Sequence, residues 1–64
     1  MREQADEQTI REYAIQAYND LGNFPEFGEE TRIAIIDTAG MLLYDAGYDV
    51  DQPTLRRIAR GLAG

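Results

Sequence analysis

The 64-residue chain has no cysteine, histidine, lysine, serine or tryptophan. Without cysteine it can form neither a disulfide framework nor a thiolate zinc site, and without histidine it lacks the commonest metal ligand and general base. The missing serine and lysine leave only carboxylates and tyrosines as acids, bases or nucleophiles. A chain this short also offers little cavity for a substrate. We therefore expect no enzymatic activity, no cofactor and no small-molecule substrate.

The chain also has no long apolar run. No stretch approaches the roughly 20 apolar residues that span a membrane. The amino-terminal stretch MREQADEQ is charged and lacks the apolar core of a signal peptide. These absences predict a cytoplasmic protein without a membrane partner.

The length predicts a single small helical domain spanning residues 1–64. A chain of this size buries only roughly 60% of the surface that it exposes when unfolded, so its own core stabilises it marginally. Close helix packing or a partner subunit would add buried area. The size of the chain therefore makes completion of the core by a second copy one of two expectations, beside close packing of its own helices.

What the sequence does contain is helical periodicity. Apolar residues recur every three or four positions in three segments, and Gly and Pro separate these segments. We predict an all-α, compact three-helix domain with helices at about residues 5–21, 29–46 and 52–62. The apolar stripe of the first helix is made of Ile10, Tyr13, Ala14, Ala17 and Leu21.

The first helix could begin at either of two places. Thr9 and Glu12 have the spacing of a capping box, but MREQADEQ consists of helix formers and could extend the helix backward.

Gly22 follows the last apolar residue of the first helix, at a position where helices commonly end. In the connection NFPEFG we expect Phe24 and Phe27 to close one end of the core; the alternative is an aromatic contact for a partner.

The second predicted helix is apolar around about half of its circumference at 100° per residue. Its apolar arc is made of Ile33, Ile35, Ile36, Ala39, Gly40, Leu42, Leu43 and Ala46. Such an arc is wider than one neighbour needs, so we expect this helix to pack against both others, or against one of them and a second copy of itself. We also expect Ala39 and Gly40 to face Ala14 and Ala17, which would bring two backbones close together. That approach would explain a glycine that costs about 1 kcal/mol relative to alanine.

The second helix contains the letters DTAG at residues 37–40, which in many GTPases bind magnesium and sense the γ-phosphate. That function needs a preceding buried strand and a P-loop with a lysine, and this chain has no lysine. On the helical interpretation Asp37 faces solvent on the polar arc with Glu30, Thr38 and Asp45. The sequence therefore excludes a nucleotide switch.

The third predicted helix divides cleanly into two faces. Asp51 or Gln52 caps it, and Pro53 lies in the first turn, where its missing N–H costs nothing. The apolar face is made of Leu55, Ile58, Ala59 and Leu62. The opposite face carries Arg56, Arg57 and Arg60. Residues 1–51 have a net charge of −9 and residues 52–64 one of +3, which makes this asymmetry the most informative feature of the chain.

Three interpretations of the charge asymmetry remain open. In the simplest, the late arginines complement a helix dipole and pair with acids elsewhere in the domain. Alternatively, LLYDAGYDVDQPTLRRIARGL resembles a helix-turn-helix whose arginine face would meet DNA, although its turn is about two residues longer than usual. Because a net charge of −6 is unfavourable for phosphate binding, DNA ranks second. The third is an acidic nucleic-acid mimic that inhibits a basic partner.

Three aspartates between the second and third helices raise the possibility of calcium. They are Asp45, Asp49 and Asp51. An EF-hand loop beginning at Asp49 would need glycine at its sixth position and glutamate at its twelfth, but these places hold Thr54 and Arg60. We therefore expect no metal site.

Apolar residues outside the three core stripes indicate where a protein partner would bind. The candidate interface residues are Ile15, Tyr18, Met41, Tyr44 and Tyr48. Tyr and Met are enriched at interfaces, and a homodimer burying the broad arc of the second helix would enlarge the small core. We predict a small acidic, non-catalytic protein-protein interaction module or regulatory accessory protein that binds itself or another protein. Its use of arginine alone as cation would suit a phage or mobile-element protein from a GC-rich host.

Overall fold

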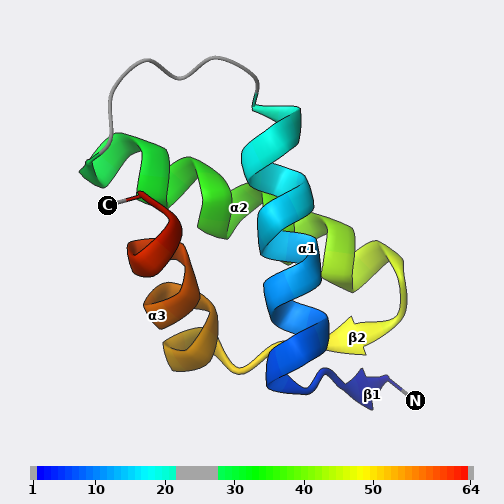
Figure 1. Cartoon of the computed structure of the whole chain (residues 1–64). Coiled ribbons are helices and arrows are strands. Elements are labelled where there is room, and N and C mark those ends of the chain that lie inside the picture. The colour runs from blue at the N-terminus through cyan, green and yellow to red at the C-terminus, as the bar shows by residue number, and fades with distance from the viewer. Residues whose placement is uncertain (1, 22–27, 64) are drawn as a thin grey trace.

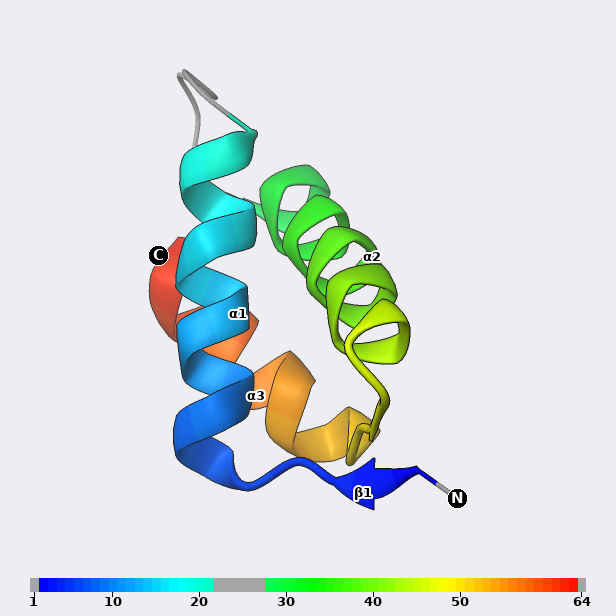
Figure 2. The same ribbon diagram turned by 90° about the vertical axis from the view of Figure 1, so that its right-hand side faces the viewer.

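Three helices surround a common core in the computed structural model, which describes residues 2–21 and 28–63. The helices are α1 (Glu7–Asp20), α2 (Glu29–Asp45) and α3 (Gln52–Ala63). Each helix packs against the other two, and in Figure 1 both strands lie beside the amino-terminal end of α1; Figure 2 shows the first of them in the view turned by 90°. The strands are β1 (Glu3–Gln4) and β2 (Tyr48–Asp49). The predicted all-α three-helix domain is confirmed. The predictions for Gly22, Phe24 and Phe27 lie outside the described residues.

Small side chains make up most of the core. The buried apolar residues of the described ranges are Ala5, Ile10, Ala14, Ala17, Ile35, Ala39, Leu43, Leu55, Ile58, Ala59 and Ala63. Six of these eleven are alanines, so the helices can lie close together, but few large side chains fill the space between them. Burial of apolar surface stabilises a fold roughly in proportion to the area removed from water. The few isoleucines and leucines therefore contribute most of that stabilisation.

An aspartate caps α1 earlier in the chain than the Thr9–Glu12 capping box predicts. The Asp6 side chain accepts a hydrogen bond from the Thr9 backbone N–H at 2.8 Å, and the helix begins at Glu7. Of the two starts that the sequence leaves open, the helix therefore has the earlier one, and Thr9 is not its cap. Asp is at least as good an N-cap as Thr, and the Thr9 N–H is one of the donors that a helix start leaves unpaired.

The ionised form of Asp6 stabilises the fold, which predicts an acid sensitivity. Its pKa lies below the ordinary value of 3.8 because the Thr9 backbone N–H, and then the Thr9 side chain, hydrogen-bond to the carboxylate. With the folded pKa below the unfolded one, this contribution is present above about pH 4 and is lost as the pH falls through the folded pKa. Asp6→Asn keeps an acceptor oxygen that does not titrate. Between about pH 5 and pH 2 we expect its urea midpoint to fall less than that of the wild type; parallel curves would contradict this.

Two short strands, which the sequence does not predict, join the start of the chain to the α2–α3 connection. They pair in parallel, with Glu3 opposite Tyr48 and Gln4 opposite Asp49. On either side of this pairing, the Glu3 N–H donates to the Gly47 carbonyl at 3.1 Å and the Ala5 N–H to the Asp49 carbonyl at 2.9 Å. Two residues per strand are too few for an alternating pattern. The first helix begins at Glu7, about two residues after the predicted start.

The connection between α2 and α3 has the glycine at the end of one helix and the aspartate cap of the next that the sequence predicts. Gly47 has a φ of 94°, which side-chain-bearing residues rarely adopt, and its N–H donates to the Tyr44 carbonyl at 3.0 Å. Asp51 accepts from the Thr54 N–H at 3.3 Å and so caps α3, whose first turn contains Pro53. These contacts confirm Asp51 as a cap and Gly47 as the end of the second helix.

The second helix packs on both neighbours, as predicted, but through a narrower stripe. Its buried residues are Thr31, Ile35, Ala39 and Leu43, spaced four apart. Ile33, predicted to belong to the core arc, is 49% exposed. Thr31 is the buried polar residue that the sequence does not predict, and no buried side-chain polar atom in the described ranges lacks a hydrogen-bond partner.

The predicted reason for Gly40 is wrong. Ala39, Ala14 and Ala17 are all fully buried in one cluster, as expected of a close helix contact. A Cβ added at Gly40, however, would meet no atom of the described chain within 4 Å. No neighbour in the described part of the protein therefore requires glycine at this position.

Candidate protein interface

The side of α2 that faces away from the core carries a group of exposed apolar residues. Ile33, Met41 and Tyr44 are three of the four large hydrophobic residues exposed in the described ranges, and Met41 and Tyr44 are 66% and 60% exposed. At 100° per residue, these positions lie on the opposite side of the helix from the buried stripe. We call the α2 face the set made of Ile33, Ile36, Gly40, Met41 and Tyr44.

A shallow groove of about 390 Å³ follows this face. It is lined by Ile36, Asp37, Gly40, Met41, Tyr44, Asp45 and Gln52. Because Gly40 has no side chain, the helix backbone itself is accessible between the apolar side chains. Two carboxylates and one amide supply the polar part of the lining. The groove therefore has a mixed lining, in which apolar side chains are bordered by acidic ones.

Arg2 lies against one end of the α2 face. Its guanidinium carbon is 3.4 Å from the centre of the Tyr44 ring, and its Nη1 donates to the Tyr44 carbonyl at 2.5 Å. The first contact is a cation–π interaction, and the second satisfies a carbonyl in the last turn of α2. The β1–β2 pairing brings Arg2 to this position. A cation thus stands beside an otherwise acidic border.

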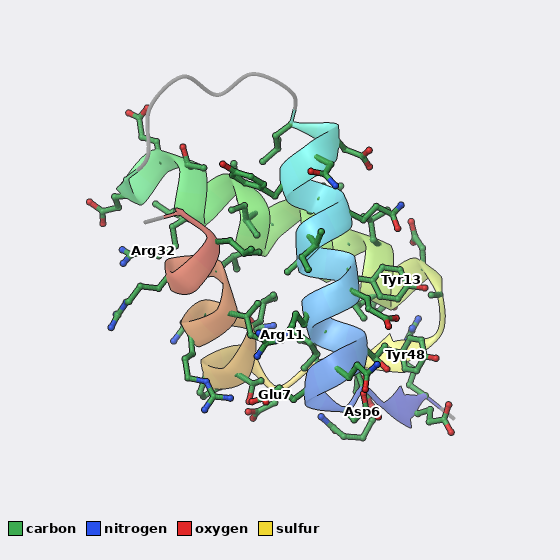
Figure 3. All side chains as sticks on the ribbon, in the orientation of Figure 1. Asp6, Glu7, Arg11, Tyr13, Arg32 and Tyr48 are labelled. Carbon is green, nitrogen blue, oxygen red and sulfur yellow. The ribbon has the colours of Figure 1, made fainter. Side chains whose placement is uncertain are left out.

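The five candidate interface residues do not form one surface. Met41 and Tyr44 line the same groove, whereas Ile15 lies in another groove between α1 and α3. Tyr18 and Tyr48 are partly buried and pack against the core. The Tyr48 ring meets the Tyr13 ring edge to face, with centroids 6.3 Å apart, and both are labelled in Figure 3. Ile33, counted as core in the sequence, is exposed on the α2 face, whereas Ile36 packs partly against the core, as predicted, and also lines the groove.

The groove between α1 and α3 has a charged end. Its volume is about 470 Å³, and its lining is Glu7, Arg11, Ile15, Arg57, Ile58, Gly61 and Leu62. Glu7 forms a hydrogen-bonded ion pair with Arg57 and lies 3.9 Å from Arg11. Glu7 and Arg11 point toward α3 in Figure 3. One arginine of the predicted anion-binding face is therefore neutralised by an acid of α1.

The other two arginines of that face are exposed. Arg56 and Arg60 form no ion pair with any residue in 2–21 or 28–63. They stand one turn apart on the solvent side of α3. The α2–α3 connection contains β2, and is thus longer than the three- or four-residue turn of a typical helix-turn-helix.

The described residues contain neither a candidate metal site nor a candidate membrane span. No group of three or more His, Cys, Asp or Glu side chains there could hold a metal ion. None of the helices in those ranges combines the length and apolarity that crossing a bilayer requires.

No protein-family model, curated protein or solved structure matches the chain.

Proposed function

We propose that the chain is a small acidic protein-protein interaction module without catalytic activity, and that the α2 face is its contact surface. The observation that carries the proposal is the exposure of Ile33, Met41 and Tyr44 on one side of α2, although α2 already packs against α1 and α3. A helix whose apolar surface exceeds what its own domain covers is suited to a further partner.

The composition of the α2 face supports this proposal. Single exposed apolar residues are normal on a soluble protein, but several on one helix side form a patch. Tyr and Met are enriched in the centres of interfaces, whereas carboxylates belong at their rims. Here Met41 and Tyr44 line the groove together, and Asp37 and Asp45 border it. The arrangement has an apolar centre and a charged margin.

The two nucleic-acid alternatives have less support. Binding to DNA depends largely on neutralising phosphates, and one of the three α3 arginines is already paired with Glu7. A domain with a net charge of −6 would also repel a duplex. A nucleic-acid mimic needs a concentrated acidic surface, but Glu29 is within 3.6 Å of Arg32. We therefore rank both below protein binding.

The test replaces one residue of the α2 face with a cation. Wild-type chain immobilised on a resin is expected to retain one or more specific proteins, including the chain itself, from an extract of cells that express it. Met41→Arg should reduce that retention at least about tenfold, because a charge in the centre of an interface must lose its water. Since Met41 is 66% exposed, the helical circular dichroism should not change.

Ile15→Arg is the matched control, because Ile15 is also an exposed apolar helix residue but lies in the groove between α1 and α3. It should retain the same proteins as the wild type. Loss of binding by Ile15→Arg with retention by Met41→Arg would move the interface to the α1–α3 groove. The proposal would be refuted if the wild type retained neither the chain itself nor another protein, or if Met41→Arg retained as much as the wild type.

A further inference from the structure

We infer that the partner of the α2 face is a second copy of the same chain, with the two α2 helices antiparallel and Gly40 near the two-fold axis. This inference rests on the proposed function and names the partner of the same surface. Three features of the face support it: a glycine at its centre with open space beside it, a residue pattern that complements itself, and opposite charges on either side of that centre.

The first feature is Gly40 itself. Glycine is unfavourable inside a helix, and no described neighbour within the chain requires it, because an added Cβ would meet nothing within 4 Å. Gly40 lies four residues from Ile36 and four from Tyr44, in the middle of the apolar groove. A glycine at such a position allows another backbone to approach closely. The space beside it is open for a second helix.

The second feature is the order of residues on either side of Gly40. In a two-fold interface, residue i of one copy contacts residue j of the other, and j contacts i. An antiparallel pair centred on Gly40 places Tyr44 opposite Ile36, so a large ring meets an aliphatic side chain. A parallel pair would instead set each Asp37 beside its own copy.

The third feature is the position of Arg2. Its guanidinium lies on the Tyr44 ring, and Tyr44 is opposite Ile36 of the second copy in the antiparallel arrangement. The neighbouring Asp37 of the second copy would then lie close to Arg2, and symmetry would form this pair twice. A chain with a net charge of −6 repels its copies in most orientations. The two Arg2–Asp37 pairs would favour this one.

The available area indicates a weak dimer. A standard interface covers about 800 Å² on each partner, which would be nearly a fifth of the 4432 Å² that this chain exposes. One helix face and the adjacent Arg2 supply less than that. We therefore expect a dissociation constant in the micromolar range, so that both monomer and dimer are observable in a concentration series.

Single-cysteine variants test the geometry, because the chain has no cysteine of its own and each variant can form a disulfide only with its copy. Met41→Cys leaves Gly40 unchanged and places its two thiols on the same side of the antiparallel pair, offset by only about 3 Å along the helices, so it should be oxidised to a covalent dimer at least about tenfold faster than Ile33→Cys. In the antiparallel pair the two residues at position 33 lie roughly 20 Å apart, well beyond the reach of a disulfide. Equal or faster cross-linking of Ile33→Cys would refute the antiparallel arrangement.

Gly40→Ala tests the interface without a cysteine. The added methyl group meets nothing within the described chain, so the thermal midpoint of the dilute monomer should stay the same or rise. Near the axis the two methyl groups would separate the helices, and we expect the dimer dissociation constant to increase at least about tenfold in sedimentation equilibrium. Gly61→Ala, a helical glycine of α3 with equally open surroundings, should leave the dissociation constant unchanged.

The outcomes separate this inference from the proposed function. A wild-type chain that stays monomeric up to millimolar concentration refutes the second copy as partner, and so does a dimer that Gly40→Ala leaves unchanged. In either case Met41-dependent binding of a different protein would leave the proposed function standing. If the chain neither formed a dimer nor bound a different protein through Met41, both this inference and the proposed function would be refuted.

Discussion

Leu55→Ala is expected to lower the free energy of unfolding by about 2–5 kcal/mol. Leu55 lies on α3 and is fully buried, and it is one of four large side chains with that degree of burial in the described ranges. Its removal deletes apolar contacts and leaves a cavity. Surrounding alanines cannot extend into that cavity, because they have no rotatable side chain. The loss should therefore fall toward the upper part of the range.

This loss is large compared with the stability of so small a protein. Domains have roughly 0.05–0.15 kcal/mol of stability per residue, so a chain of 64 residues is stable by about 3–10 kcal/mol. We expect a substantial fraction of Leu55→Ala to be unfolded in buffer without denaturant. Urea titration followed by far-ultraviolet circular dichroism measures the change.

Leu62→Ala is the matched control for Leu55→Ala. The deleted atoms are the same and the helix is the same, but Leu62 is only partly buried at the edge of the core. Water can fill the space that its side chain leaves, so we expect a loss of about 1 kcal/mol. Equal losses for the two variants would show that the core is not centred on Leu55.

Gly47→Val is expected to lower the free energy of unfolding by about 2 kcal/mol or more. The φ of 94° at this position is unfavourable for any residue with a Cβ, and most so for a β-branched one. An added Cβ would meet no described atom within 4 Å, so the cost comes from the backbone conformation and not from a collision. A shift toward ordinary dihedrals would also disturb the hydrogen bonds of Gly47 to Tyr44 and Glu3.

The backbone explanation is tested by Gly47→Asn. Asparagine tolerates positive φ better than other residues with side chains, because its short polar group can hydrogen-bond locally. We expect it to regain at least about half of the stability lost in Gly47→Val, measured in the same urea titration. If the two variants were equally unstable, the cost would have to come from the size of the side chain.

The helices were largely predictable from the sequence. In α3 the apolar and charged residues alternate with a clean helical period, and Asp51 and Pro53 mark its start, so its limits agree within one residue. Gly47 likewise marks the end of α2. The start of α1 was less clear, because Asp6 and Thr9 are both good caps and the sequence does not say which side chain reaches a free N–H.

The orientation of α2 was harder to predict. When the apolar residues of a helix cover an arc as wide as half its circumference, periodicity does not say which part of that arc meets the core. Ile33 and Ile35 have the same chemistry and are two positions apart, yet only Ile35 is buried. Buried Thr31 belongs to the stripe through its spacing of four from Ile35 and not through its polarity. Packing against α1 and α3 together decides these positions.

The candidate interface was therefore predictable only in part. Met41 and Tyr44 could be recognised as apolar residues beyond the expected core arc. Helical spacing places Ile33 within the broad apolar arc and so predicts that it is buried. The contact of Arg2 with Tyr44 depends on the β1–β2 pairing, which joins residues more than forty positions apart. A pairing this distant and this short leaves no local signal in the sequence.

The parallel pairing of β1 with β2 also sets the order in which parts of the molecule come apart. It closes a long loop through only two residues on each strand, and the entropy of closing a loop rises with its length. The helices bury nearly all of the core, whereas Ala5 is the part of it nearest the strands. We infer that β1 folds last and opens first, by a local fluctuation that leaves the helical core intact. Each such opening releases Arg2 from Tyr44, so the α2 face would alternate between a form with this cation and a form without it.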